Sequence, residues 1–153
     1  MSILLFTAIS GLLACGMGVA LLGSVKLPLA RRLAIDEGRV GGMVSMFPLA
    51  MIPVILGMGF LADLIGQQQV LIGGVVVMAI SLLLLATAGR YVVALAAVLL
   101  LSAGWSAQIN VLNVITPAAF SATDSPAYAT NLANFFFGLG AFLTPVFVAF
   151  LFG

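Results

Sequence analysis

Between Val40 and Gly89 the chain carries one charged side chain, Asp63. A lone carboxylate buried at the centre of a bilayer costs about 2.5 to 3.5 kcal/mol on insertion scales. On either side of Asp63 lies an apolar run long enough to cross a bilayer, and the segment from Gly59 to Gln69 is marked by glycine and glutamine. The sequence therefore predicts a tight hairpin at the membrane surface, with Asp63 in it.

The composition supports a membrane setting for the whole chain. Hydrophobic residues make up 64% and charged residues 6% of it, whereas about 25% of the residues in a globular domain are charged. We therefore predict an all-α integral membrane protein. Five Lys and Arg against four Asp and Glu leave a net charge of +1, which offers neither a nucleic-acid footprint nor a polybasic lipid-binding segment.

The chemistry-bearing residues are few. The chain has no histidine, and Cys15 is its only cysteine, so a disulfide within the chain is impossible and a His/Cys metal site lacks ligands. The apolar runs contain neither paired carboxylates nor a Ser/Lys pair. We therefore expect no enzyme activity, no metal and no cofactor, and we interpret Cys15 as a small packing residue.

Five uncharged runs reach the roughly 20 residues that a helix needs to cross the hydrocarbon core. The first run exceeds the apolar core of a signal peptide and follows no basic segment, so we expect it to be retained as a span. Together the runs predict one transmembrane domain over residues 1–153, with helices at 3–25, 40–62, 70–88, 91–115 and 128–152.

The connections carry cap and turn chemistry. Asp36 is a predicted N-cap for the second span, because its oxygen can accept from free backbone N–H groups. Residues 88–90 are too few for anything but a turn. Ser121 to Pro126 combines capping residues with a proline, which is typical of a helix start, so we expect the fifth span to begin there.

The basic residues give one prediction of orientation. All five lie in the first and third connections, and the positive-inside rule would place these connections in the cytoplasm and the N-terminus outside.

The third span is apolar and is expected to face lipid, but the fourth and fifth spans carry side-chain amides, which need partners in hydrocarbon. Two interpretations stay open for them. They can join helices, at about 0.6 to 2 kcal/mol each, or meet interfacial water; alternatively, two facing polar stripes can line a cavity. The residues expected to face such a path are Trp105, Gln108, Asn110, Asn113, Asn131 and Asn134.

Small residues and prolines predict how the helices approach one another. Gly11, Ala14, Cys15 and Gly18 give the first span a small face, whose default role is close helix packing. Prolines inside apolar runs bend helices and free carbonyl groups, and they occur here at Pro48, Pro53 and Pro145.

The hairpin between the second and third spans resembles the signature of the major facilitator superfamily of transporters. The frame of that signature is present as Gly59, Asp63 and Gly66, while Leu64 and residues 67–69 stand where the family has basic residues. The resemblance implies that these three frame residues belong to a gate, in which Asp63 would meet a helix N-terminus or an arginine of an opposite half. The plainer interpretation is an exposed aspartate that ends a helix.

A second resemblance covers Asn131 to Pro145, which is similar to the fifth helix of the fucose-permease branch of that superfamily. The five spans would then match the first five of the six helices in one transporter half, and no second half is present. Such halves are built from two inverted three-helix repeats, and Pro53-Val54 aligned with Pro145-Val146 pairs the second span with the fifth. The family places the N-terminus and the Asp63 hairpin in the cytoplasm, and we favour this orientation over the basic-residue count.

The resemblance implies part of a secondary transporter for a small polar solute, with sugars as a candidate. We expect the protein in the plasma membrane, as a protein of the bacterial inner membrane. It would work by alternating access together with a second half. Its expected partners are the lipid bilayer, the solute, and the second transporter half or other membrane subunits; nucleic acid is not expected. The alternative is a non-transport accessory subunit that packs transporter-like helices against a larger membrane complex.

Overall fold

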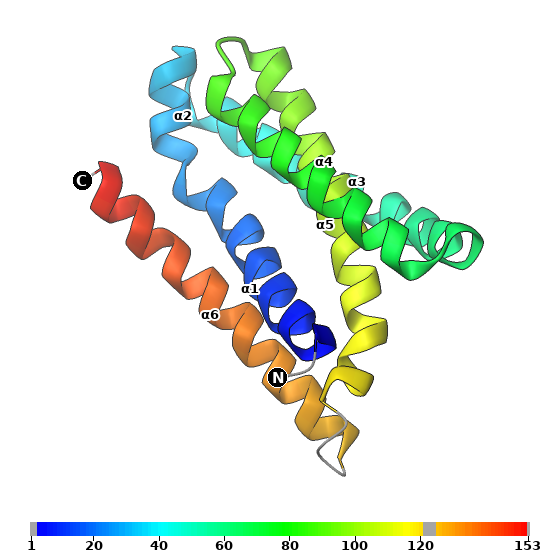
Figure 1. Cartoon of the computed structure of the whole chain (residues 1–153). Helices are drawn as coiled ribbons and strands as arrows, with labels where there is room; N and C mark the ends of the chain where they lie inside the picture. The colour runs from blue at the N-terminus through cyan, green and yellow to red at the C-terminus, as the bar shows by residue number, and fades with distance from the viewer. Residues whose placement is uncertain (1–2, 121–124, 153) are drawn as a thin grey trace.

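The computed structural model describes residues 3–120 and 125–152, which form six helices (Figure 1). The five predicted spans are confirmed as long apolar helices whose ends lie within four residues of the predicted ones. The chain is a multi-pass membrane protein. The helices are α1 (Ile3–Ser24), α2 (Lys26–Leu33), α3 (Glu37–Ile65), α4 (Gln67–Thr87), α5 (Tyr91–Ala119) and α6 (Pro126–Phe152).

Helix α2 occupies most of the first connection and was not predicted from the sequence. Its 8 residues are too few to cross a membrane, and the helix is followed by its C-cap Ala34, whose φ of 51° is left-handed. Arg31 and Arg32 lie in its last turn, where positive charge suits the helix dipole. The Arg32 guanidinium also donates to the carbonyl oxygens of Leu85 and Ala86. This contact ties α2 to the end of α4.

The predicted caps and turns are confirmed where the structure describes them. The Asp36 side chain accepts from the Arg39 backbone N–H at 2.9 Å and so caps α3. Gly66 alone separates α3 from α4, and its φ of 96° is one that glycine adopts without strain. Helix α6 begins at Pro126; the preceding residues 121–124 of the fourth connection lie outside the described part of the chain.

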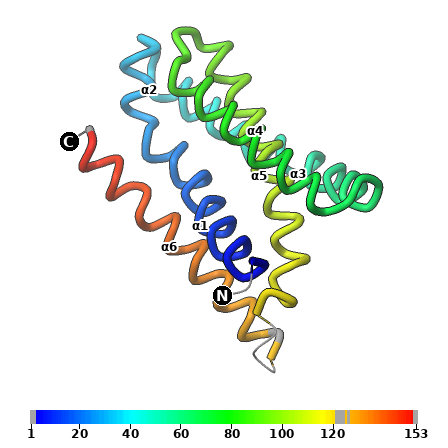
Figure 2. Tube along the Cα trace, in the orientation of Figure 1, coloured from blue at the N-terminus to red at the C-terminus, as the bar shows by residue number. Residues whose placement is uncertain are grey.

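Three helix pairs hold the bundle together (Figures 1 and 2). Helices α1 and α6 run side by side in the same direction, and so do α3 and α5. Helix α4 packs along α5 in the opposite direction. Helix α5 thus lies at the centre, in contact with α1, α3 and α4.

Glycines set the closest of these contacts. A Cβ atom on Gly16 would lie 2.0 Å from the Phe137 carbonyl oxygen, and one on Gly140 would lie 2.1 Å from the Leu13 carbonyl oxygen. Gly74 and Gly104 face each other in the same way, because a Cβ on Gly104 would lie 2.8 Å from the Gly74 oxygen. The backbones of α1 and α6, and those of α4 and α5, therefore touch directly.

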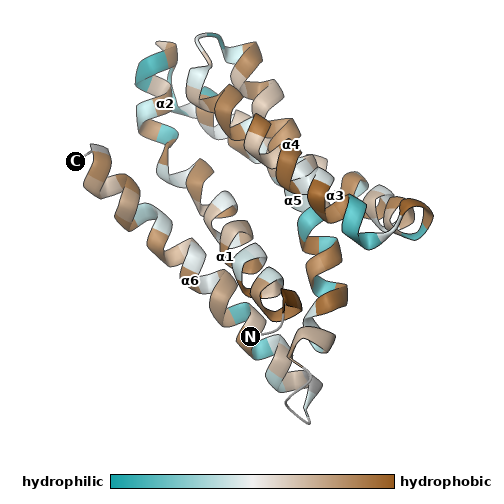
Figure 3. Cartoon of the chain, viewed as in Figure 1, coloured by the Kyte–Doolittle hydropathy of each residue, from teal (hydrophilic) through white to brown (hydrophobic). Residues whose placement is uncertain are grey.

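The predicted small face of α1 is a packing face, as expected. A Cβ on Gly11 would meet Leu112 of α5 at 2.8 Å, and one on Gly18 would meet Met78 of α4 at 2.6 Å. The exposed faces of α3, α4 and α6 are mostly hydrophobic (Figure 3) and suit contact with lipid. The predicted prolines lie inside their helices, Pro48 and Pro53 in α3 and Pro145 in α6.

Candidate functional site

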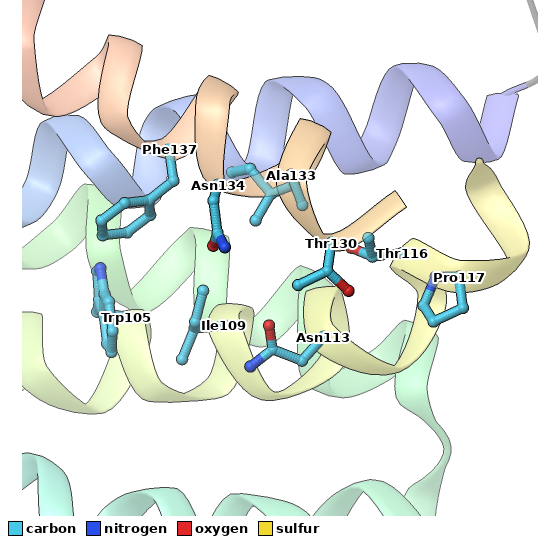
Figure 4. Close-up of a pocket in the computed structure, with 10 residues that line it drawn as sticks. Trp105, Ile109, Asn113, Thr116, Pro117, Thr130, Ala133, Asn134 and Phe137 are labelled. Carbon is cyan, nitrogen blue, oxygen red and sulfur yellow. The ribbon is translucent and has the colours of Figure 1, made fainter. Parts of the chain in front are cut away.

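A pocket of about 240 Å³ lies where α5 and α6 face each other beside α1 (Figure 4). It combines two side-chain amides, two threonines and an indole with apolar walls. Its lining residues are Leu12 of α1, Trp105, Ile109, Asn113, Thr116 and Pro117 of α5, and Thr130, Ala133, Asn134 and Phe137 of α6.

Helical periodicity brings these residues to one place. Trp105, Ile109 and Asn113 follow one another at intervals of four on α5, so they share one face of that helix. On α6, Thr130 and Asn134 have the same spacing. In Figure 4 the Asn113 and Asn134 side chains lie on opposite walls of the pocket.

Trp105 is held firmly in its wall of the pocket. Its indole N–H donates to the Cys15 carbonyl oxygen at 2.9 Å, which links α5 to α1. Its ring meets Phe47 of α3 edge-on, with centroids 5.9 Å apart and an angle of 70° between the planes. Only 8% of the residue is exposed. One side chain thus joins three helices and still lines the pocket.

Asn113 and Asn134 are exposed in this chain, although both lie on membrane-spanning helices. Asn113 is about 9 Å from the end of α5 and Asn134 about 12 Å from the start of α6, at a rise of 1.5 Å per residue. These depths place both amides inside the helix ends. An amide there needs water, a solute or another polar group as its partner.

Three of the residues predicted for the path lie elsewhere. Asn110 donates from its amide to the Ile55 carbonyl oxygen of α3 at 3.1 Å. Gln108 is 2% exposed, and its Nε2 lies 2.9 Å from the sulfur of Met78 in α4. Asn131 is exposed on α6 but does not line the pocket. Asn110 and Gln108 therefore join helices, which is one of the two interpretations that the sequence left open. Trp105, Asn113 and Asn134 are brought together in the pocket.

Two serines of α5 differ in whether they join that helix to a neighbour. Ser102 donates to the Phe47 carbonyl oxygen at 3.0 Å and so fastens α5 to α3. Ser106, one turn later, is fully buried, and its Oγ has no hydrogen-bond partner among the described residues.

Apart from Trp105, the pocket residues that carry no side-chain amide were not predicted from the sequence. Thr116, Thr130 and Phe137 share the helical spacing of the two asparagines, and that spacing could have identified them. Thr116 also donates to the Leu112 carbonyl oxygen at 2.6 Å. Leu12 could not be found in this way, because the proximity of α1 depends on the Gly16 and Gly140 crossing.

The predicted gate residues form a second group, in the hairpin rather than in the pocket. Asp63 is exposed in the last turn of α3, and Gly66 is the residue that forms the turn between α3 and α4. Gly59 faces α5, where a Cβ would lie 3.6 Å from the Asn110 amide nitrogen. Among the described residues, no three His, Cys, Asp or Glu side chains gather into a metal site.

Comparisons of the chain with models of protein families, with curated proteins and with solved structures found no match. The geometry of the pocket and of the helix pairs is therefore the basis for a functional argument.

Proposed function

We propose that the chain is part of a secondary transporter for a small polar solute and that the pocket between α5 and α6 binds this solute. The observation that carries the proposal is the pair of exposed amides, Asn113 and Asn134, on opposite walls of one pocket inside the membrane-spanning helices. The volume of about 240 Å³ lies just below the usual range of about 300 to 1,000 Å³ for drug-sized ligands. It suits a small solute.

The lining chemistry favours a hydroxylated solute, with sugars as the first candidates. Each amide offers two N–H donors and a carbonyl acceptor, and Thr130 adds a hydroxyl to the same wall as Asn134. The Trp105 ring provides an apolar surface on which the C–H face of a sugar ring can lie. No charged side chain lines the described pocket, so a neutral solute fits better than an ion.

The arrangement of the helices supports the transporter part of the proposal. In an inverted repeat, α1 would correspond to α5 and α3 to α6, with opposite directions across the membrane. Helices α1 and α5 do run in opposite directions, and each packs along the second helix of the other unit, α6 and α3 respectively. This exchange of partners agrees with the pairing of Pro53 and Pro145.

Alternating access requires two bodies that rock against each other, so we propose that a second set of transporter helices completes the functional unit. The gate would then be formed by Gly59, Asp63 and Gly66. Exposure of Asp63 leaves its carboxylate accessible to a helix N-terminus or an arginine of the second body. A bacterial inner membrane is the proposed location, with the Asp63 hairpin in the cytoplasm.

The test uses Trp105, which is the only tryptophan of the chain and lines the pocket. The protein, purified from its membrane with whatever accompanies it, is titrated with a panel of monosaccharides and polyols while indole emission is recorded. A partner that contains tryptophan is handled by subtracting the signal of a Trp105→Phe variant. We expect one class of solute to change the emission saturably, and Asn134→Ala or Asn113→Ala to weaken its binding about tenfold, the loss of one to two hydrogen bonds.

Asn131→Ala is the matched control, because Asn131 lies on α6 and is exposed but does not line the pocket. Equal weakening by the control would contradict the assignment of the pocket. Cysteines placed at Asn134 and at Leu83 then report on water: a soluble thiol reagent should label the first and spare the second, which lies on the exposed apolar face of α4. An unreactive Asn134→Cys in the assembled protein, with no solute bound, favours the accessory-subunit alternative.

A further inference from the structure

A second cavity lies at the opposite end of the bundle, where α1 ends. It is a groove of about 530 Å³ between α1, α2, α4 and α6. Its walls are apolar and include Leu21, Pro28, Leu85 and Val148, and the polar side chain among its lining residues is Arg32.

The fold concentrates positive charge at this end, although the sequence contains no polybasic segment. The ends of α1 and α4, the whole of α2 and the starts of α3 and α5 meet here (Figure 1), and Figure 3 shows the hydrophilic patch on α2. Arg39 lies over the Tyr91 ring at 5.9 Å, away from the groove lining. The charged residues at this end are Lys26, Arg31, Arg32, Arg39 and Arg90, against Asp36 and Glu37.

Arg32 is oriented by the end of α4. Its two terminal nitrogens donate to the carbonyl oxygens of Leu85 and Ala86, which are among the last acceptors of that helix. A guanidinium has five N–H donors in one plane, so these two bonds leave three donors. Arg32 is exposed, and a planar fork of free N–H groups matches the oxygens of a phosphate.

We propose that this groove binds one anionic phospholipid, with its phosphate on Arg32 and an acyl chain against the apolar walls. The groove lies between the ends of membrane-spanning helices, which is the level of phospholipid head groups and of the first acyl carbons. An apolar helix in the same place would cover the Arg32 charge without a partner, which is unfavourable. The residues that form the proposed lipid site lie at one end of the bundle. The site is therefore the same whether that end faces the cytoplasm or the outside.

The test compares two lipids with the same acyl chains. The purified protein in detergent is titrated with dioleoyl phosphatidylglycerol or dioleoyl phosphatidylcholine, and bound lipid is counted by native mass spectrometry. We expect one tightly held phosphatidylglycerol per chain, and a loss of about fivefold in its affinity in Arg32→Gln, as expected for one charge at a membrane surface. Arg90→Gln removes the same charge at the same end outside the groove and should leave binding unchanged.

A second variant covers the case in which Arg32→Gln fails to fold because the bonds to α4 are lost. Val148→Trp fills the groove without changing charge and should abolish the tightly held lipid, whereas Phe147→Trp, at an exposed position that does not line the groove, should retain it. Equal binding of the two lipids, an equal effect of Arg90→Gln, or full binding in Val148→Trp would overturn the proposal. Disulfide formation between Val148→Cys in two copies would also overturn it, because the groove would then hold a second chain.

Discussion

Helices α5 and α6 both carry side-chain amides, but two of the three on α5 join it to neighbouring helices, whereas both on α6 are exposed. On α5, Gln108 is buried against α4 and Asn110 donates to the backbone of α3. On α6, Asn131 and Asn134 are exposed. The same residue type therefore joins helices where a neighbour crosses it and stays open to a solute or partner where none does. The difference depends on the surroundings of each helix and not on its own sequence.

The packing of the two helices differs in the same sense. Helix α5 has α1, α3 and α4 around it, whereas α6 rests mainly on α1. Thr144 adds one side-chain contact across that interface, to the Met17 carbonyl oxygen at 3.5 Å. Since α6 has fewer neighbours, we expect it to be the more easily displaced wall of the pocket. Substitutions at both helices can test this contrast.

The largest effect is expected from Gly16→Ala. The new Cβ would lie 2.0 Å from the Phe137 carbonyl oxygen, so the backbones of α1 and α6 must separate, at a cost of about 1 to 3 kcal/mol in the free energy of unfolding. Unfolding in detergent measures the loss. Gly23→Ala is the control, because among the described residues no atom lies within 4 Å of its Cβ position. Equal stability of the two variants would show that α6 does not pack as closely as described.

A smaller effect separates the two kinds of amide. Asn110→Ala removes the bond to the Ile55 oxygen and should lower the free energy of unfolding by about 0.6 to 2 kcal/mol. Asn134→Ala removes an exposed side chain and should change the free energy of unfolding by less than about 0.5 kcal/mol, although under the proposed function it should weaken solute binding. Thermal unfolding of both variants in the same detergent tests the pair. The reverse order would make Asn134 the residue that joins helices.

Much of the fold could be predicted from the sequence, for identifiable reasons. Uncharged runs of sufficient length give the five spans, Asp36 gives the start of α3, and Gly66 gives the hairpin, since each depends on local chemistry. Helix α2 was missed because its 8 residues produce no span-length signal. The tie from Arg32 to α4 joins residues more than fifty positions apart, which no local pattern reveals.

The candidate site was predictable only in part. The amides of α5 were singled out as polar groups that need partners, but periodicity could not assign Asn110 to a neighbouring helix and Asn113 to a pocket, because residues three apart lie on the same side of a helix. That distinction requires the position of α3, which is set by contacts such as Ser102 to the Phe47 oxygen. The Gly16 and Gly140 crossing likewise places α6 against α1, and so determines which residues of α6 reach the pocket.

The two serines of α5 provide a finer comparison. Ser102→Ala removes a buried hydrogen bond to α3 and leaves the Phe47 oxygen with one partner fewer, so we expect a loss of about 1 kcal/mol in the free energy of unfolding. Ser106→Ala removes a buried oxygen that has no partner among the described residues, and should be neutral or slightly stabilising. Denaturant titration of both variants checks the difference. A loss in Ser106→Ala as large as that in Ser102→Ala would indicate a partner that this chain alone does not provide.

The smallest effect on stability is expected at the hairpin, where Asp63→Asn removes an exposed charge. The carboxylate lies in the last turn of α3, whose dipole disfavours it, and beside the first turn of α4, whose dipole favours it. These contributions oppose each other, so unfolding of the isolated chain should change by less than about 0.5 kcal/mol. If the chain is part of the transporter that we propose, the same change in the assembled protein should release the proposed gate, which would appear as faster labelling of Asn134→Cys by a soluble thiol reagent. Gln68→Ala alters an exposed polar residue of the same hairpin without removing charge and serves as the control. If labelling is equal in both variants, Asp63 does no more than end a helix, and the functional part of α6 is independent of the hairpin.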